Sequence, residues 1–468
     1  MNLKNSTVLK NISYSFLANI VSMGISALMI MVLPKFLGVA DYGIWQLYLF
    51  YISYLGIFHF GWLDGIYLRY GGCYLEQLDK RKFSSQFLAV ACFEMLIAAI
   101  GFGVAEFCVN DVTLRTVLKF ASMVLVPTIL FTFCSFILQI TNHIKQYAQL
   151  VLFEKLLFFV LVMCYLLFEQ SYFGLLCIHI VCVLASMCYG RYLVRNLFIN
   201  KFENISSVIN ESYENINVGS KLLIANLAGM LMLGIVRFGI SQEWDVITFG
   251  KVSLTLSISN FVMIFINSLS VVFFPMLKRI EESEQRELYE KIRVALMMIL
   301  FTALLGYYPL KAMLTWWLPK YKDALVYMAI LFPICLFESK VVLLTNTYLK
   351  SLRKEATMMK INFCTVLISI LLTYVSAKVV HNLDLMVLSI LLLFVTKSVV
   401  SELFIGRYLN IKLSKYITQE IILAMCFVAV NYFISNLLIG ICCYTLFLGI
   451  YLFLNKDKAL SIDFFRRV

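Results

Sequence analysis

The sequence predicts an all-α membrane protein with about fourteen transmembrane helices. Of its 468 residues, 62% are apolar and only 14% are charged. A soluble protein is about half apolar and about a quarter charged. Because a helix needs about 20 apolar residues to cross a bilayer, the apolar residues suffice for about fourteen spans and leave little for a soluble domain.

Polar residues divide the chain into successive apolar segments of membrane-spanning length. The short basic segment 1–10 precedes a run without a small-residue cleavage site, so we expect the first span to remain as an anchor. The last two spans are separated by a very short turn. The expected spans are 11–35, 42–68, 83–108, 112–139, 147–169, 172–195, 216–241, 244–275, 288–310, 322–350, 355–377, 383–408, 416–434 and 436–454.

The lysine and arginine residues predict the orientation of the chain. With the N-terminus in the cytoplasm, most of the 39 Lys and Arg residues fall on cytoplasmic segments, among them Lys80-Arg81-Lys82 and Arg466-Arg467. This positive-inside pattern places both termini in the cytoplasm. The basic residues lie in short loops and not on a soluble face, so the net charge of +12 does not indicate nucleic-acid binding.

The order of the spans predicts two lobes. We expect residues 1–195 and 218–410 to form an N-terminal and a C-terminal six-helix lobe. Residues 196–217 are expected to be a mobile cytoplasmic linker, and residues 411–468 to add a helix pair and a basic cytoplasmic tail. One offset separates both Ala18-Asn19 from Ala225-Asn226 and Gly43 from Gly250. Parallel repeats of this kind occur in transporters.

The motifs of common enzymes are absent from the sequence. It contains neither the H-E-x-x-H metal motif nor the G-x-x-x-x-G-K-[ST] phosphate loop. The four histidines are far apart, and the cysteines lie mostly in apolar runs without a C-x-x-C pair. We therefore expect no catalytic residue, no metal and no cofactor, and a membrane transporter in place of an enzyme.

Charged residues inside the expected spans are the candidates for a functional site. Each costs about 2.5–3.5 kcal/mol near the bilayer centre, so it faces a cavity or a partner. Lys340 and Lys397 lie deepest, and Arg237 shares a helical stripe with Asn226. The candidate substrate-binding residues are Arg237, Lys251, Lys340, Lys397, Lys221 and Asn226.

Acidic residues inside the spans leave two interpretations open. Glu338 lies two residues from Lys340, and Glu402 lies five residues from Lys397, so these groups could pair as neutral structural bridges. Alternatively, the lysines line a cationic cavity for an anionic substrate, and a carboxylate couples transport to an ion. The candidate coupling residues are Glu94, Asp64, Glu338 and Glu402.

Several stretches of the chain resemble a known transporter family. They include Phe36–Gly43 (FLGVADYG), Gly61–Gly65 (GWLDG) and Val218–Phe238 (VGSKLLIANLAGMLMLGIVRF). The chain resembles the Wzx-type polysaccharide flippases, which form part of the polysaccharide transporter family in the multidrug/oligosaccharidyl-lipid/polysaccharide exporter superfamily. The likeness covers the first twelve spans, and its motifs are of a packing kind, so they indicate the family better than the substrate.

The resemblance implies two six-helix lobes around a central cavity that opens alternately to the two sides. The implied substrate is an undecaprenyl-pyrophosphate-linked oligosaccharide repeat unit of O-antigen or capsule, flipped across the bacterial inner membrane. The implied partners are membrane lipid and the polymerase and chain-length proteins of the same pathway. Arg237 and, more loosely, Lys251, Lys340 and Lys397 would meet the pyrophosphate.

Other functions remain alternatives. Fourteen spans also fit a lipid II flippase. The superfamily includes ion-coupled multidrug exporters as well, although cations in the cavity would repel their usual cationic substrates. An integral-membrane polymerase or acyltransferase usually has a large outer loop, and the outer loops expected here are short.

Overall fold

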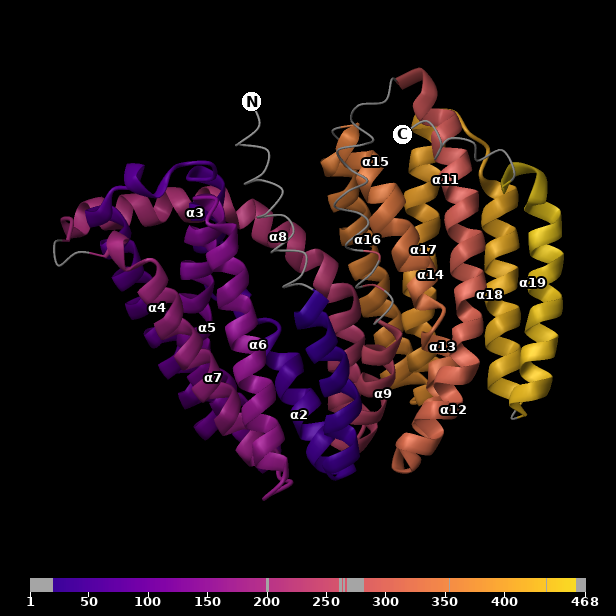
Figure 1. The fold of residues 1–468 in the computed structure, drawn as a ribbon, viewed down its shortest axis with the longest axis horizontal. Coiled ribbons are helices and arrows are strands. Elements are labelled where there is room, and N and C mark those ends of the chain that lie inside the picture. Colours follow the sequence, from indigo (N-terminus) through magenta and orange to yellow (C-terminus); the bar gives the residue numbers. More distant parts are fainter. Residues whose placement is uncertain are drawn as a thin grey trace. The chain divides into compact units, whose positions relative to one another are not determined.

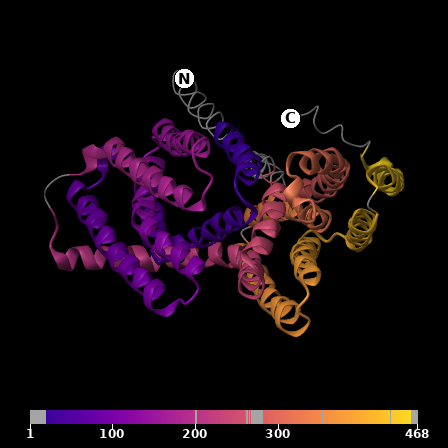
Figure 2. The same cartoon turned by 90° about the horizontal axis from the view of Figure 1, so that it is seen from below.

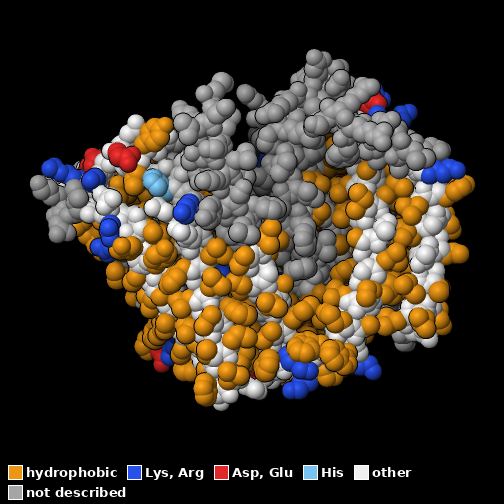
Figure 3. Space-filling view, in the orientation of Figure 1, with side chains coloured by type: hydrophobic (Ala, Val, Ile, Leu, Met, Phe, Trp, Pro, Cys, Tyr) orange, Lys and Arg blue, Asp and Glu red, His pale blue; other side chains and the backbone are white. Residues whose placement is uncertain are grey.

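The computed structural model describes residues 20–198, 202–260, 263, 266, 282–352, 354–434 and 436–459, which form helices joined by turns (Figure 1). These residues include no strand. Eleven helical segments among them are long and apolar enough to cross a membrane, so the chain is an all-α, polytopic membrane protein. Apolar side chains cover most of the described surface in the view of Figure 3, as lipid-facing helices require. The chain divides into two compact units, and the boundary in the sequence lies between Leu227 and Ala228.

In the first unit, helix α5 packs against α2, α3, α4, α6 and α7, and it is the most buried of the unit's long helices. Side chains that accept backbone N–H groups fix two helix starts: Asp79 begins α4 and Asp111 begins α5. The helices are Ile20–Phe36, α2 (Val39–Ile52), α3 (Trp62–Arg69), α4 (Lys80–Cys108), α5 (Val112–Ile140), α6 (Ile144–Leu166), α7 (Tyr172–Leu193) and the start of α8 (Ile205–Glu243), with 3-10 turns η1 (Leu55–Ile57), η2 (Leu75–Gln77) and η3 (Arg195–Leu197).

In the second unit, the segment Ala324–Ser351 is the most buried apolar span. It consists of several short helical pieces, including a π-helical turn, and α17 packs along it. After α8 the unit contains α9 (Val246–Ser259), α11 (Glu282–Ala303), η4 (Leu304–Gly306), α12 (Tyr307–Trp317), η5 (Pro319–Tyr321), η6 (Ala324–Val326), α13 (Tyr327–Leu331), α14 (Ile334–Ser339), η7 (Lys340–Thr345), α15 (Asn346–Ser351), α16 (Glu355–Tyr374), η8 (Val375–Val379), α17 (Leu383–Leu409), α18 (Ser414–Phe433) and α19 (Leu437–Ala459).

Besides the divided segment Ala324–Ser351, the spans expected at 42–68 and 288–310 differ from the observed helices, and most of the expected span 244–275 beyond residue 260 lies outside the described residues. The span expected at 42–68 is interrupted, because α2 ends at Ile52 and α3 begins only at Trp62, directly after Phe60 and Gly61, which have left-handed backbone conformations. The span expected at 288–310 begins earlier, at Glu282, and continues through η4 and α12 to Trp317. The two helices expected at the end of the chain are present as α18 and α19.

The segment 196–217, expected to be a mobile cytoplasmic linker, is helical over most of its length, and its role as a linker stays a prediction. From Ile205 onward this segment forms the start of α8, a continuous helix of 39 residues. Several of its polar side chains contact the rest of the first unit, as described below. The division into two six-helix lobes and a helix pair remains a prediction, as do fourteen spans and cytoplasmic termini, because residues 1–19 and 460–468 lie outside the described part.

Candidate functional site

Four charged side chains form a buried ion cluster in the second unit. The Nζ atom of Lys340 donates to Glu402 Oε2 at 2.6 Å and to Glu420 Oε2 at 2.8 Å. Arg293 contacts the same two carboxylates through its guanidinium, with Nη2 3.0 Å from Glu420 Oε2. All four side chains are at most 1% exposed, so neither water nor lipid reaches them.

Four helical elements supply the cluster. Arg293 comes from α11, Lys340 from the first position of η7, Glu402 from α17 and Glu420 from α18. Two positive and two negative charges balance, which is the condition under which buried ions are tolerated. The cluster therefore joins the C-terminal helix α18 to the centre of the second unit.

Lys340 and Glu402 pair with each other and not with the charged residues nearest to them in the sequence. Lys340 pairs with Glu402, 62 residues away, and not with the neighbouring Glu338. Residues two apart on a helix point about 200° apart, so Glu338 and Lys340 face opposite sides. The structural interpretation therefore applies to Lys340 in this conformation, since both of its carboxylate partners are in place.

Lys397 has a different environment from Lys340. Its side chain is buried, with 9% exposure, and its charge lies close enough to Glu338 to interact with it. In the described part of the chain, no carboxylate lies within 4.0 Å of its ammonium group. Lys397 is therefore a buried lysine without a carboxylate in direct contact among the described residues, unlike Lys340.

Arg237 and Lys251 lie on the helical pair α8–α9. Arg237 Nη2 donates to Ser253 Oγ at 3.2 Å, and its guanidinium lies over the Phe249 ring, 5.3 Å from the centroid. In the turn between the helices, hydrogen bonds from Thr248 hold the pKa of Asp245 below its ordinary value, and the charge of Lys251 lowers it further. Arg237 and Lys251 are both half-buried.

Lys221 and Asn226 are exposed side chains of α8. Both belong to the part of the helix that lies in the first unit.

Glu94 is a fully buried carboxylate in α4 of the first unit. It is 0% exposed, and neither carboxylate oxygen has a hydrogen-bond partner among the described residues. The antiparallel helices α4 and α5 meet where the Phe87 and Phe133 rings are 5.4 Å apart and where Gly101 faces Ser122. Glu94 lies midway between these contacts, opposite the region of Pro127, where α5 lacks one backbone hydrogen bond.

Asp64 lies close to His59 at the interruption between α2 and α3. The N–H of Gly61 donates to His59 Nδ1 at 3.0 Å, so neutral His59 carries its proton on Nε2. This Nε2 lies 3.9 Å from Asp64 Oδ2, and both side chains are largely buried. Among the described residues, no group of three His, Cys, Asp or Glu side chains is placed to hold a metal ion.

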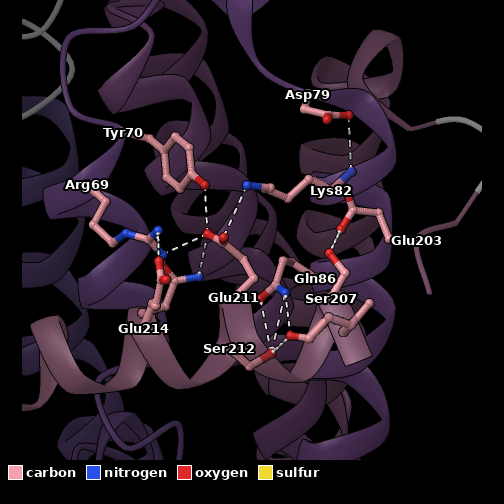
Figure 4. Close-up of polar contacts among 12 residues, drawn as sticks. Arg69, Tyr70, Asp79, Lys82, Gln86, Glu203, Ser207, Glu211, Ser212 and Glu214 are labelled. Carbon is pink, nitrogen blue, oxygen red and sulfur yellow. Dashed lines mark hydrogen bonds and ion pairs between the residues drawn. The ribbon is translucent and has the colours of Figure 1, made fainter. Parts of the chain in front are cut away.

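A second ion network connects the start of α8 to the rest of the first unit (Figure 4). Glu211 accepts hydrogen bonds from Arg69 Nη1 and the Tyr70 hydroxyl, both at 2.7 Å, and from Lys82 Nζ at 3.1 Å. Arg69 also donates to Asn215 Oδ1 at 2.6 Å. These contacts fix α8 to α3 and to the first turn of α4.

Close contacts of Gly61, Gly65 and Gly219 let α8 cross α3 at short range. A Cβ atom on Gly65 would lie 1.9 Å from the Asn215 carbonyl oxygen, and one on Gly219 would lie 1.9 Å from the Gly61 carbonyl oxygen. Real Cβ atoms do not approach so closely, so only glycine fits at Gly65 and Gly219. Two stretches that carry the family resemblance, GWLDG and the start of VGSKLL, thus meet at this crossing.

Solved structures show which fold this is, although no protein-family model and no curated protein matches the sequence. The lipid II flippase MurJ, in an inward closed conformation, is 11% identical over 96% of this chain and 99% of that chain, with a TM-score of 0.62. The chain has the fold of a membrane transporter.

Two further transporters share this fold. An inward-facing multidrug resistance transporter of the MATE family in the MOP superfamily is 10% identical over 89% of this chain and 100% of that chain, with a TM-score of 0.58. A MOP superfamily transporter from Pyrococcus furiosus is 11% identical over 86% of this chain and 96% of that chain, with a TM-score of 0.50. The chain thus shares its fold with transporters of the MOP superfamily, the multidrug/oligosaccharidyl-lipid/polysaccharide exporter superfamily that contains the family it resembles in sequence.

Sequence reasoning missed Arg293, Glu420 and Glu211. Arg293 and Glu420 are charged residues near the starts of the expected spans 288–310 and 416–434. Charged residues at the start of a span can usually reach water at the membrane surface. In the folded protein, Arg293 and Glu420 are instead buried and paired with each other. Glu211 was assigned to the linker, where charged residues are normally solvated.

Proposed function

We propose that this chain is a flippase for a lipid-linked oligosaccharide. It would move an undecaprenyl-pyrophosphate-linked repeat unit of O-antigen or capsule from the cytoplasmic to the outer leaflet of a bacterial inner membrane by alternating access. The observation that carries the proposal is a transporter fold, shared over nearly the full length with a lipid II flippase, combined with the buried Lys397, which has no carboxylate within 4.0 Å among the described residues.

The proposed contacts to the pyrophosphate are cationic side chains of the second unit. Lys397 supplies a point charge, and the planar guanidinium of Arg237 suits a phosphate oxygen pair. Lys251 is a secondary candidate in the same unit. Lys221 and Asn226, on the part of α8 that belongs to the first unit, are secondary candidates for contacts to phosphate or sugar. Lys340 is removed from this set, because Glu402 and Glu420 already neutralise it.

The proposed coupling residue is Glu94. An ionised carboxylate without a donor is costly in a buried site, and bound H⁺ or another cation removes that cost. Its burial without a partner distinguishes it from Glu402, which belongs to the ion cluster. Glu338, beside Lys397, and Asp64, beside His59, remain secondary candidates.

The second candidate function is translocation of lipid II. The observation that favours it is the similarity to the lipid II flippase structure, the one with the highest TM-score of the three described. Lipid II and an O-unit carrier share a pyrophosphate and a long lipid chain and differ in the sugar part. The same cationic residues would serve both substrates. Multidrug export is disfavoured, because Lys397 would repel cationic drugs.

Complementation in two strains distinguishes these functions. We expect this chain to restore surface polysaccharide in a strain that lacks its own O-unit or capsule flippase, and to fail in a strain depleted of its lipid II flippase. The reverse result would establish the lipid II function. Failure in both strains, with the protein present in the membrane at normal levels, would contradict the flippase proposal.

A further inference from the structure

The helix α8 is much longer than a membrane span. Its 39 residues extend about 58 Å at 1.5 Å per residue, whereas the hydrocarbon core of a bilayer is about 30 Å thick. About half of the helix must therefore lie outside the hydrocarbon core. The part in question begins at Ile205, because the polar residues of α8 are concentrated between residues 205 and 221.

One side of this first part of α8 is polar and faces the protein. Glu211, Ser212 and Asn215 are buried against α3 and α4, and Gly219 lies in the close crossing with Gly61. Gln86 of α4 adds a hydrogen bond to the carbonyl oxygen of Val208 at 3.2 Å. In a free surface helix the polar side would face water, so the usual arrangement is inverted here.

The outward-facing side is divided into an apolar and a polar strip. Ile205, Ile209 and Tyr213 follow each other at intervals of four residues and are 79%, 60% and 70% exposed. At about 100° per residue, they form a strip next to the buried side. The polar strip lies further round the helix and consists of the exposed residues Ser206, Asn210 and Asn217, with the exposed Glu214, which pairs with Arg69, at its edge.

The start of α8 lies at the end of the first unit where a membrane surface is expected. Figures 1 and 2 show the start of α8 running across the direction of α4, α5, α6 and α7. Its Glu211 binds Lys82, and the neighbouring Lys80 and Arg81 are exposed at the same end of α4. Exposed lysine and arginine at a helix end are typical of the lipid headgroup region.

We propose that residues 205–217 form an interfacial helix that rests on the lipid of the leaflet beside Lys80 and Arg81. Ile205, Ile209 and Tyr213 enter the boundary between headgroups and acyl chains, and the polar strip faces water. A helix with one side on protein, one on lipid and one on water accounts for all three strips. The partner is the bilayer itself, and the inference does not depend on the transported substrate.

Fluorescence quenching at two neighbouring positions tests this placement. A dansylalanine residue replaces Ile209 or, as the matched control, Asn210, in the full-length protein in lipid nanodiscs. We expect acyl-brominated lipid to quench the label at position 209 and iodide in the buffer to quench the label at position 210. Equal iodide quenching at both positions, or no quenching by brominated lipid at position 209, would overturn the proposal.

A pair of double variants provides a second measurement. Ile205→Asp with Ile209→Asp places charges in the lipid strip, and Ser206→Asp with Asn210→Asp places the same charges in the water strip. We expect the first pair to lower the unfolding temperature in nanodiscs and the second to leave it unchanged. Equal shifts would contradict the proposal. If the first pair does not accumulate, the quenching of the label at position 209 decides.

Discussion

The Nζ atom of Lys340 lies 2.6 Å from Glu402 Oε2, in a site where both side chains are at most 1% exposed. Arg293 and Glu420 complete this site and balance its charge. Lys397, only five residues before Glu402 on α17, is buried without a carboxylate at this distance among the described residues. The two lysines, both expected deep in their spans, thus have different surroundings, and the consequences can be tested.

The first prediction concerns the ion cluster. Lys340→Met leaves two buried carboxylates with one cation, and breaking a buried pair of this kind costs about 3–5 kcal/mol. We expect a large loss of thermal stability in detergent, measured by the remaining monodisperse fraction after heating. Lys340→Met combined with Glu420→Gln restores the charge balance and should recover part of the loss. A double variant as unstable as the single one would show that charge balance is not the reason.

The second prediction concerns Lys397. Lys397→Ala removes a charge that has no close counterion, so we expect normal accumulation and stability but loss of polysaccharide export. Lys397→Arg keeps the charge and should retain more export than Lys397→Ala. Export and membrane levels are measured in the same complemented strain. If Lys397→Ala exports normally, or loses activity only because the protein does not accumulate, the ligand role is wrong.

The third prediction concerns Glu94. Glu94→Gln keeps the shape of the side chain and removes its ability to bind a cation, so we expect normal folding. Transport should lose its dependence on an imposed proton or sodium gradient, measured in proteoliposomes. Glu106→Gln, in the same helix but paired with Lys119 near its end, is the matched control and should keep that dependence. Unchanged gradient dependence of Glu94→Gln would exclude Glu94 as the coupling residue.

The fourth prediction concerns the crossing of α3 and α8. Gly65→Ala places a Cβ atom against the Asn215 carbonyl, so the two helices must move apart. Overpacking of this kind costs about 1–3 kcal/mol, and loss of the Glu211 contacts would add to it. Gly103→Ala in α4 has nothing within 4 Å of the new atom and serves as the control. Equal thermal stability of the two variants would contradict the observed crossing.

The sequence predicted most helix positions because a membrane helix satisfies its backbone hydrogen bonds within one continuous apolar segment. It did not predict the interruption before α3, which depends on the left-handed backbone of Phe60 and Gly61. It also missed the pairing of Lys340 with Glu402, because a contact across 62 residues depends on how helices pack. Nearness in sequence favoured Glu338, which lies on the opposite side of the helix.

The helix at residues 205–217 was not predicted for a related reason. The polar composition of residues 205–217 is ordinarily a property of solvated segments, and it gives no apolar stripe of the usual kind. Here the polar side chains of Glu211 and Asn215 are buried by partners on α3 and α4, which a local pattern does not reveal. The two glycine-containing motifs, GWLDG and VGSKLL, were recognised separately, but their contact required the fold.

Flipping of a labelled substrate by the purified protein tests the central claim most directly. The substrate is an undecaprenyl-pyrophosphate-linked oligosaccharide with a fluorescent group on the sugar, in both leaflets of proteoliposomes, and the reagent is externally added dithionite. Dithionite added outside removes the fluorescence of the outer leaflet only. With an active flippase, we predict that labels from the inner leaflet reach the outer leaflet and lose their fluorescence as well, whereas vesicles with the Lys397→Ala variant keep the inner-leaflet fluorescence. Retention of the inner-leaflet fluorescence with the correctly folded wild-type protein, under any imposed ion gradient, would contradict the flippase assignment.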